Sequence, residues 1–265
     1  MKRQKRMDKV VLTAVEAVAD IPSGAIIAAG GFGICGIPTA LIDALVERGI
    51  TDLEIISNNC GIDGVGLGRL LDNKQIRRIV ASYVGENKEF AHQYLSGELE
   101  VELTPQGTLA ERLRAAGVGI PAFYTVTGMG TQVAMGGLPW LYESDGSVTV
   151  ESPAKLTTEF DGRTYLLERA LPADFALVRG WKGDRHGNLV FRKAARNFNP
   201  VCAMAGKIAI AEVEHMVEPG ELDPDSIHLP GVYIDRVVPL TAAQAVDKGI
   251  ERLTTRPLQL TNAGE

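Results

Sequence analysis

The chain has 265 residues, 45% of them hydrophobic, and a formal net charge of −6, so it can bury a substantial core, roughly 70–75% of the surface exposed by the unfolded chain. Its acidic balance and scattered Lys and Arg residues argue against a nucleic-acid partner. No apolar run approaches the ~20 residues of a membrane span, and the basic residues 1–6 are not followed by the apolar segment of a signal peptide, so we expect no membrane partner and a cytoplasmic location.

Helix-like and strand-like segments alternate along the first half of the chain. In chain order we expect helix 12–19, strand 25–29, helix 39–48, strand 53–57, helix 67–71, strand 76–83, helix 86–95, strand 99–103, helix 108–117 and strand 121–125. Gly49 is placed to end the second helix, and Thr108–Glu111 have the spacing of a capping box. This alternation is typical of an α/β fold with an open, mostly parallel sheet that helices flank on both faces.

The alternation stops near residue 128. Glycines and turn signals at 144–146 and 161–162 predict a flap or a small antiparallel insertion over residues 128–162. The apolar residues of 128–160 are where we expect an interface with another protein chain. Further strands are expected at 175–181, 189–191, 209–213 and 232–238. We therefore expect one domain over residues 1–240 and a mobile C-terminal tail over residues 241–265.

A glycine-rich loop joins the first expected strand to the next helix. It reads Gly30, Gly31, Phe32, Gly33, Ile34, Cys35 and Gly36. Because glycine has no Cβ, the backbone of such a loop can approach a ligand closely, and free N–H groups at the following helix start favour an anion. A tight turn without a ligand is the alternative.

The same loop matches the GxGxxG pattern of dinucleotide sites, from Gly31 to Gly36. Such sites carry an acidic residue near the end of the second strand, and this chain has Ser57, Asn58 and Asn59 there. A nicotinamide-binding oxidoreductase is thus a weak alternative.

Amide side chains follow two other strands. Asn58 and Asn59 end the strand 53–57, and Gln106 follows the strand 99–103. Because the carboxyl ends of parallel strands meet at one edge of a sheet, we expect these residues to gather there with the glycine loop. Buried amides need hydrogen-bond partners, so each is a candidate for a ligand carbonyl or carboxylate, with an Asx turn as the alternative.

No convincing nucleophile or metal site accompanies these residues. The histidines are far apart and have no metal-ligand spacing: His92, His186, His215 and His228. The three cysteines, Cys35, Cys60 and Cys202, fit reduced thiols, and no His lies near Cys35 in the sequence to activate it. Solvated or ion-paired roles are expected for Glu86 and for Arg192, Lys193 and Arg196. The residues alone therefore predict a ligand-binding domain that holds half of a catalytic site.

The segment from Ser23 to Pro38 resembles the first signature of the family I coenzyme A transferases. In that signature an Asp or Asn and a Gly precede an apolar run, which is followed by Gly-Gly-Phe and Gly-x-Pro; here Ser23 replaces the Asp or Asn and can make the same turn hydrogen bond. Residues 57–59, 82–87, 94–112 and 191–198 resemble the succinyl-CoA:3-ketoacid branch of the family. The 3-oxoadipate transferases share the loop and residues 191–198, so they are the alternative, but Tyr83–Asn87 favour the 3-ketoacid branch.

The resemblance, which extends from about residue 8 to about 240, implies the first (alpha) of the two subunits of a transferase that is either a heterodimer or a heterotetramer. Such an enzyme moves CoA from succinyl-CoA to a 3-oxoacid such as acetoacetate, a step of ketone-body metabolism, by ping-pong chemistry. In this family the covalent glutamate lies in a Ser-Glu-Asn-Gly segment of the second half, and this chain lacks that segment. The resemblance thus implies that the second subunit supplies the glutamate.

The resemblance also assigns roles within this chain. Gly30 to Gly36 would bind CoA, which is a substrate rather than a cofactor, and Gln106, Asn58 and Asn59 would bind the acyl substrate. No residue of this chain would form the covalent intermediate, and no cofactor or metal is expected. A stand-alone protein that binds acyl-CoA without a transferase partner is a further alternative.

Overall fold

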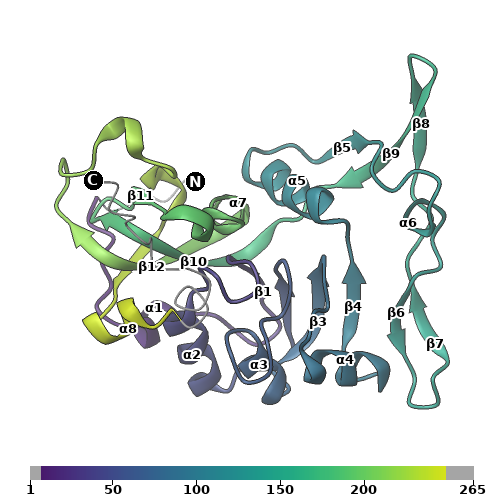
Figure 1. Ribbon diagram of the computed structural model, residues 1–265, viewed down its shortest axis with the longest axis horizontal. Helices are drawn as coiled ribbons and strands as arrows, with labels where there is room; N and C mark the ends of the chain where they lie inside the picture. Colours follow the sequence, from purple (N-terminus) through teal and green to yellow (C-terminus); the bar gives the residue numbers. More distant parts are fainter. Residues whose placement is uncertain (1–6, 249–265) are drawn as a thin grey trace, which may run out of the picture.

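A parallel sheet organises the computed structural model, which describes residues 7–248 (Figure 1). Its eight strands run in the order β13-β12-β10-β1-β2-β3-β4, with β11 paired to β10. All neighbours along this path are parallel, and only the pair of β10 and β11 within this sheet is antiparallel. The bounds are β1 (Ile26–Ala29), β2 (Leu53–Ile56), β3 (Ile76–Ala81), β4 (Glu100–Leu103), β10 (Ala173–Asp184), β11 (Leu189–Val190), β12 (Gly206–Val217) and β13 (Arg236–Pro239). The predicted α/β class is confirmed.

Helices cover both faces of this sheet. Those on one face are α1 (Ala14–Ala17), α2 (Thr39–Arg48), α3 (Gly68–Asp72) and α4 (Lys88–Leu95), and those on the other are α5 (Gln106–Gly117) and α7 (Asn199–Ala205). In β1, Ile27 and Ala29 enter the first core, and Ala28 between them enters the second. A strand buried on both faces needs a continuous apolar run, which explains why the sequence signal for β1 is strong.

Two helix ends test the predicted local signals. Gly49 ends α2 with a left-handed φ of 62°, as predicted. The capping box at Thr108 is wrong: α5 begins two residues earlier, at Gln106, and the preceding Pro105 offers no side-chain cap. Thr108 instead lies inside the first turn, and its buried hydroxyl makes no hydrogen bond among the described residues. A fixed proline φ before the helix starts it without a capping side chain.

Residues 121–170 form an arm beside the edge strand β4 (Figure 1). It consists of β5 (Ala122–Thr125), α6 (Gln132–Met135), β6 (Pro139–Tyr142), β7 (Val148–Glu151), β8 (Thr157–Phe160) and β9 (Arg163–Arg169). The predicted antiparallel insertion is therefore confirmed. The interpretation of 121–125 as a fifth strand of the parallel sheet is wrong, because β5 pairs with β9 in a separate antiparallel sheet.

The hairpin of β6 and β7 packs where a further strand would have paired with β4. Trp140 lies against the guanidinium of Arg78, 5.6 Å from ring centroid to Cζ, and Tyr94 donates its hydroxyl to the carbonyl of Pro139 at 2.6 Å. Arg78 also bonds carboxylates on the strands beside it, Glu54 at 2.5 Å and Glu102 at 2.5 Å. These contacts cover the sheet edge, which explains why β5 leaves it.

The C-terminal strands are longer than predicted or shifted. β10 and β12 each have 12 residues, so they extend beyond the sheet partners of β1. The predicted strand 232–238 begins only at Arg236, after a 3-10 turn, η3 (Gly231–Tyr233). Two further 3-10 turns are η1 (Lys193–Arg196) and η2 (Pro224–Ser226). Within the predicted tail, α8 (Ala242–Val246) is anchored by Arg179, which donates to the carbonyl of Gln244 at 3.1 Å, and residues 249–265 lie outside the described residues.

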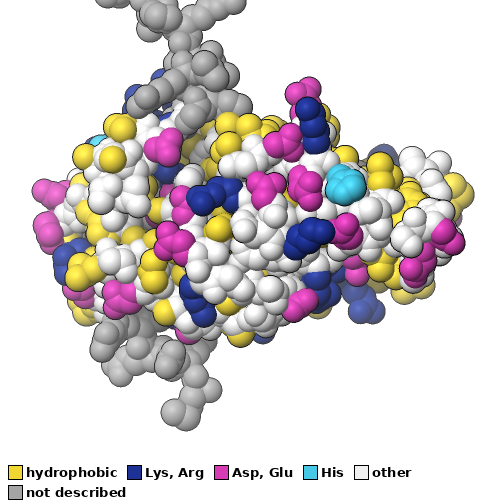
Figure 2. All heavy atoms as spheres, turned by 90° about the horizontal axis from the view of Figure 1, so that it is seen from below, with side chains coloured by type: hydrophobic (Ala, Val, Ile, Leu, Met, Phe, Trp, Pro, Cys, Tyr) yellow, Lys and Arg dark blue, Asp and Glu magenta, His cyan; other side chains and the backbone are white. Residues whose placement is uncertain are grey.

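The surface mixes charges of both signs. Figure 2 shows Lys and Arg interspersed with Asp and Glu on one face of the molecule. Within residues 7–248 no helix combines the length and the apolar character that crossing a membrane requires. In the arm, Met135, Leu156 and Phe160 are exposed by 67%, 71% and 49%. They lie in the region where the sequence predicts an interface with another chain.

Candidate functional site

The glycine loop folds back on itself at the carboxyl end of β1. Phe32 and Cys35 exchange backbone hydrogen bonds, each of 3.0 Å, around a turn in which Gly33 has a φ of 62°. Gly31, at a φ of 114°, packs so closely that a Cβ there would lie 2.5 Å from Cγ2 of Ile37. The loop is therefore a compact turn whose conformation excludes larger residues at these positions.

The three predicted loops meet at one edge of the sheet, as the sequence indicates. The backbone N–H of Gly33 donates to Oδ1 of Asn59 at 3.0 Å, which joins the first loop to the second. Nε2 of Gln106 donates to Oδ1 of Asn58 at 2.8 Å, which joins the second loop to the start of α5. Asn58, Asn59 and Gln106 thus lie together beside the glycine loop.

Asn58 and Asn59 differ in which of their side-chain atoms form hydrogen bonds within the described residues. Asn59 uses both ends of its amide inside the protein, since its Nδ2 also donates to the carbonyl of Gly61 at 3.2 Å. Oδ1 of Asn58 accepts from Gln106 and, at 2.9 Å, from Oγ of Ser82, whereas its Nδ2 makes no hydrogen bond among the described residues. The Asn58 residue is only 3% exposed, but its Nδ2 is not among the fully buried atoms that lack a hydrogen bond, so this N–H donor can be reached at the strand end. Asn59 acts as a tie between loops.

The start of α2 has its own anion. The buried carboxylate of Glu212, on β12, accepts from the backbone N–H of Leu41 at 3.0 Å and from that of Ala40. Arg179, on the adjacent strand β10, is its ion-pair partner at 3.1 Å. Burial raises the pKa of Glu212 to about 7, against the lowering effect of Arg179 and the two backbone donors. The hydrogen-bond acceptor expected at this helix start is thus supplied by the chain itself.

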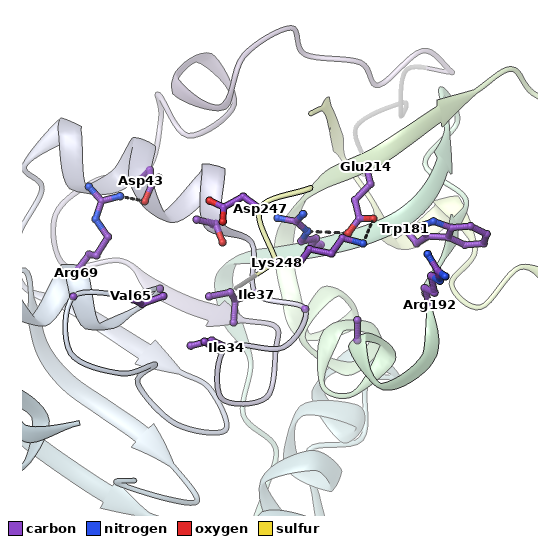
Figure 3. Close-up of a pocket in the computed structure, with 16 residues that line it drawn as sticks. Ile34, Ile37, Asp43, Val65, Arg69, Trp181, Arg192, Glu214, Asp247 and Lys248 are labelled. Carbon is purple, nitrogen blue, oxygen red and sulfur yellow. Dashed lines mark hydrogen bonds and ion pairs between the residues drawn. The ribbon is translucent and has the colours of Figure 1, made fainter. Parts of the chain in front are cut away.

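A cavity of about 450 Å³ lies beside the glycine loop (Figure 3). Ile34, Gly36 and Ile37 form its wall on the loop side. Its charged lining residues are Asp43, Arg69, Arg179, Arg192, Glu214, Asp247 and Lys248, and Trp181 adds an aromatic surface. Most of these charges are paired: Arg69 with Asp43, and both Arg179, at 3.1 Å, and Lys248, at 2.5 Å, with Glu214. Neither Asn58 nor Gln106 is among its lining residues, so the cavity and the amide cluster are separate features of the loop's surroundings.

The segment before α7 supports the loop. Asn197 donates to the carbonyl of Cys35 at 3.0 Å, and Asn199 donates to that of Gly36 at 2.9 Å. A Cβ at Gly36 would lie 2.8 Å from the carbonyl oxygen of Ala195. The sequence singles out the basic residues of this segment but gives no sign of its two asparagines. Arg192 does form a contact, with its Cζ 5.6 Å from the ring centroid of Trp181.

Two of the three cysteine thiols lie in surroundings that make them poor nucleophiles. Cys60 and Cys202 are fully buried, and burial raises the pKa of both, that of Cys202 to about 12. Glu86 lies on the loop before α4 and is exposed to solvent. Nδ1 of His228 accepts from the backbone of Phe191 at 2.9 Å, a packing role. Within residues 7–248 no group of three or more His, Cys, Asp or Glu residues is arranged to hold a metal ion.

Comparison with known proteins identifies one family. The model of the family described as Coenzyme A transferase matches residues 11–240. A Mycobacterium bovis protein, named as the A subunit of a probable succinyl-CoA:3-ketoacid coenzyme A transferase, is 69% identical over 94% of this chain and all of its own length. The corresponding subunit of the Helicobacter pylori succinyl-CoA:3-ketoacid coenzyme A transferase is 52% identical over 94% of this chain and 99% of its own.

Solved structures have the same fold. The acyl-CoA transferase YdiF of Escherichia coli O157:H7 is 26% identical and superposes with a TM-score of 0.76 over 92% of this chain, which spans only 49% of that larger chain. Glutaconate coenzyme A-transferase of Acidaminococcus fermentans, at 21% identity and a TM-score of 0.73, covers 91% of this chain and is itself covered to 78%. The second likeness shows the fold alone.

Proposed function

Because the chain belongs to the coenzyme A transferase family, we propose that it is the first subunit of a two-subunit enzyme that moves CoA from succinyl-CoA to a 3-oxoacid such as acetoacetate. The resemblance to the 3-ketoacid branch agrees with the names of its relatives, which are the corresponding subunits of succinyl-CoA:3-ketoacid transferases. Transfer to 3-oxoadipate is the alternative. CoA enters as a substrate, and the proposed reaction uses no further cofactor.

The reaction proceeds by two exchanges at a glutamate of the second subunit. Its carboxylate attacks the thioester carbonyl of succinyl-CoA and releases CoA thiolate, which leaves a mixed anhydride. The thiolate then attacks the glutamyl carbonyl, so succinate departs and a glutamyl-CoA thioester remains. Acetoacetate attacks that thioester, and the same steps in reverse give acetoacetyl-CoA and free glutamate. Every step exchanges a carboxylate for a thiolate, so the atoms and charges balance.

The observation that carries this proposal is the amide cluster at the carboxyl edge of the sheet. Each step places negative charge on an oxygen, and a donor that the protein already holds in place stabilises that charge strongly. Nδ2 of Asn58 is such a donor, held by Gln106 at 2.8 Å and by Ser82 at 2.9 Å. Oε1 of Gln106, which makes no hydrogen bond among the described residues, would orient the acyl group.

The other predicted residues have supporting roles in this proposal. Asn59 ties the second loop to Gly33, so its effect on substrate is indirect. The loop from Gly30 to Gly36 forms this subunit's wall of the CoA cleft, with backbone rather than side chains towards the ligand.

In this proposal the second subunit docks on the same edge of the sheet rather than on the arm, where the sequence predicts an interface. Phe32, Ile62, Val65 and Tyr83, on three successive loops there, are exposed by 47%, 37%, 40% and 60%. Several exposed apolar side chains on adjacent loops are typical of a protein interface. Docking there would bring the attacking glutamate next to Asn58 and exclude water from it.

The test is CoA transfer by this chain alone and together with a second subunit whose sequence contains Ser-Glu-Asn-Gly. Succinyl-CoA is the donor, and acetoacetate and 3-oxoadipate are separate acceptors. We expect activity only when both subunits are present, with acetoacetate preferred as the acceptor. Replacing this subunit by its Asn58→Ala variant in the mixture should lower kcat about 10²–10³-fold. Full activity of this chain alone would refute the proposal, and preference for 3-oxoadipate would favour the alternative.

A further inference from the structure

Asn199 lies beneath the glycine loop and contacts both of its ends. It is the first residue of α7 and is fully buried. Its Nδ2 donates to the carbonyls of Gly36, at 2.9 Å, and of Ala195, at 2.8 Å. Its Oδ1 accepts the backbone N–H of Arg179, at 3.0 Å. One amide thus bridges the loop, the segment before α7 and the central strand β10.

The other end of the loop lies directly on the same side chain. A Cβ at Gly30 would lie 2.0 Å from Oδ1 and 2.7 Å from Cγ of Asn199. The backbone of Gly30 and the carbonyl of Gly36 therefore have one shared support. Asn199 belongs to the C-terminal half of the chain, whereas Asn58 belongs to the N-terminal half, so the loop is held between the two halves.

The loop in turn touches the amide cluster. Gly33, midway between the two ends, donates its N–H to Asn59, and Asn59 is covalently next to Asn58, whose Oδ1 accepts from Gln106 and Ser82. Asn199 is therefore linked to Asn58 through a continuous series of contacts and covalent bonds that passes through the loop backbone. Asn199 itself has no hydrogen bond to the cluster among the described residues.

We propose that Asn199 is a positioning residue for the transferase reaction: it holds the glycine loop in the place that aims the free N–H of Asn58 at the oxygen that becomes charged. This inference rests on the proposed function. Donors aimed at a developing charge act mainly in the transition state, so a small displacement lowers kcat much more than it changes KM. A misplacement of about 1 Å costs roughly 10²-fold in rate.

The test compares Asn199→Ala with Asn188→Ala in the complex with the second subunit. Asn188 is the matched control, because it also bonds at both ends of its amide, to Gly231 at 2.8 Å and Asp184 at 2.8 Å, but makes no bond to the loop. We expect about 10²-fold lower kcat and a KM within about threefold for Asn199→Ala, and near-normal kcat for Asn188→Ala. Equal losses of kcat in the two variants would overturn the proposal.

A double variant tests whether Asn199 acts through Asn58. The Asn58→Ala, Asn199→Ala pair should be no more than about threefold slower than Asn58→Ala alone, because the donor to be aimed is already absent. Losses that multiply would overturn the proposal. Should Asn199→Ala not fold, Asn199→Asp keeps the size and the bond from Arg179, but it turns a carboxylate oxygen towards the carbonyl of Gly36, and the same results are expected.

Amide hydrogen exchange separates this proposal from the proposed function. In the isolated chain, the amides of residues 30–37 should exchange faster in Asn199→Ala than in both Asn188→Ala and the wild type. That result needs no substrate, so it can support the loop contact even when the wild-type complex fails to transfer CoA. Unchanged exchange in this segment would overturn the positioning role whatever the activity.

Discussion

Replacement of Gly30 by alanine gives a sharp test of how the loop is supported. Gly30 does not have a left-handed φ, so an alanine there meets no backbone strain. The obstacle is the side chain of Asn199, whose Oδ1 would lie 2.0 Å from the new methyl group. Real Cβ contacts are not this short, so Asn199 must rotate away, and its bonds to Gly36 and Arg179 are then lost.

The size of the effect follows from those losses. Overpacking of a well-packed site costs about 1–3 kcal/mol, and each buried group left without its hydrogen bond costs about 1–3 kcal/mol. With two bonds lost, we therefore expect Gly30→Ala to lower the free energy of unfolding by about 3–9 kcal/mol, and so to lower Tm by roughly 10 °C or more. Thermal and urea unfolding of the purified chain measure both quantities.

Two comparisons make the result specific. Gly107→Ala is the control, because a Cβ at Gly107 in α5 meets no atom within 4 Å and its φ is not left-handed; alanine there should be neutral or stabilise by up to about 1 kcal/mol. The Gly30→Ala, Asn199→Ala double variant should lose about 1–3 kcal/mol less than the sum of the single losses, since the clashing atoms are gone. Additive losses, or a Gly30→Ala protein as stable as the wild type, would refute the reasoning.

Three further results are expected. Burial raises the pKa of Glu102, but Arg112 and Arg78 lower it more, so its pKa in the folded protein lies below the ordinary 4.5. The charged carboxylate therefore stabilises the fold above pH ~4.5, and this contribution is lost as the pH falls further. Glu102→Gln should therefore cost about 3 kcal/mol at pH 7 and clearly less at pH 4 in urea unfolding, with the exposed Glu111→Gln as control; a cost independent of pH would contradict this. Glu212→Ala should cost about 3 kcal/mol because it leaves Arg179 short of a partner and uncaps α2, whereas Glu159→Ala in the arm should change the free energy of unfolding by less than about 0.5 kcal/mol. A thiol reagent should modify one cysteine per folded chain, Cys35, and all three after unfolding; fast modification of Cys202 in the folded protein would contradict its burial.

The sequence predicts best what depends on neighbouring residues. The continuous apolar run of β1, the mainly apolar strands β2 and β3, the helical period of α2 and the glycine that ends it, Gly49, are local signals, and each is confirmed. The convergence of Asn58 and Gln106 is also confirmed, because it follows from one general property of parallel sheets.

Errors arise where distant segments compete for the same place. Nothing in residues 121–125 says that the edge of β4 is already covered by Trp140 from a hairpin about 15 residues later, so the sequence pattern places β5 in the wrong sheet. The capping box at Thr108 fails because Pro105 starts α5 first. The roles of Glu212 and Asn199 escape the sequence for a related reason. Their partners at the loop are more than 160 residues away in the chain, so no spacing can indicate them; a charged residue inside the apolar run 209–213 is the one local sign of Glu212.

The loop also explains why its GxGxxG pattern is a poor guide to a nucleotide. In dinucleotide sites the glycines make room for a pyrophosphate at the helix start. Here the close approaches are to the chain itself: a Cβ at Gly31 would meet Ile37, and one at Gly36 would meet Ala195. The backbone donors are likewise used internally, Gly33 towards Asn59 and the helix start towards Glu212. The same glycine spacing therefore also arises when a tight loop packs against other parts of its own chain. What distinguishes this loop from a dinucleotide site is the group that accepts from the backbone at the helix start. The carboxyl group of Glu212, on a neighbouring strand, already accepts from the backbone at the helix start, so in this chain the pattern matches a tight loop packed on its own protein rather than a phosphate cradle.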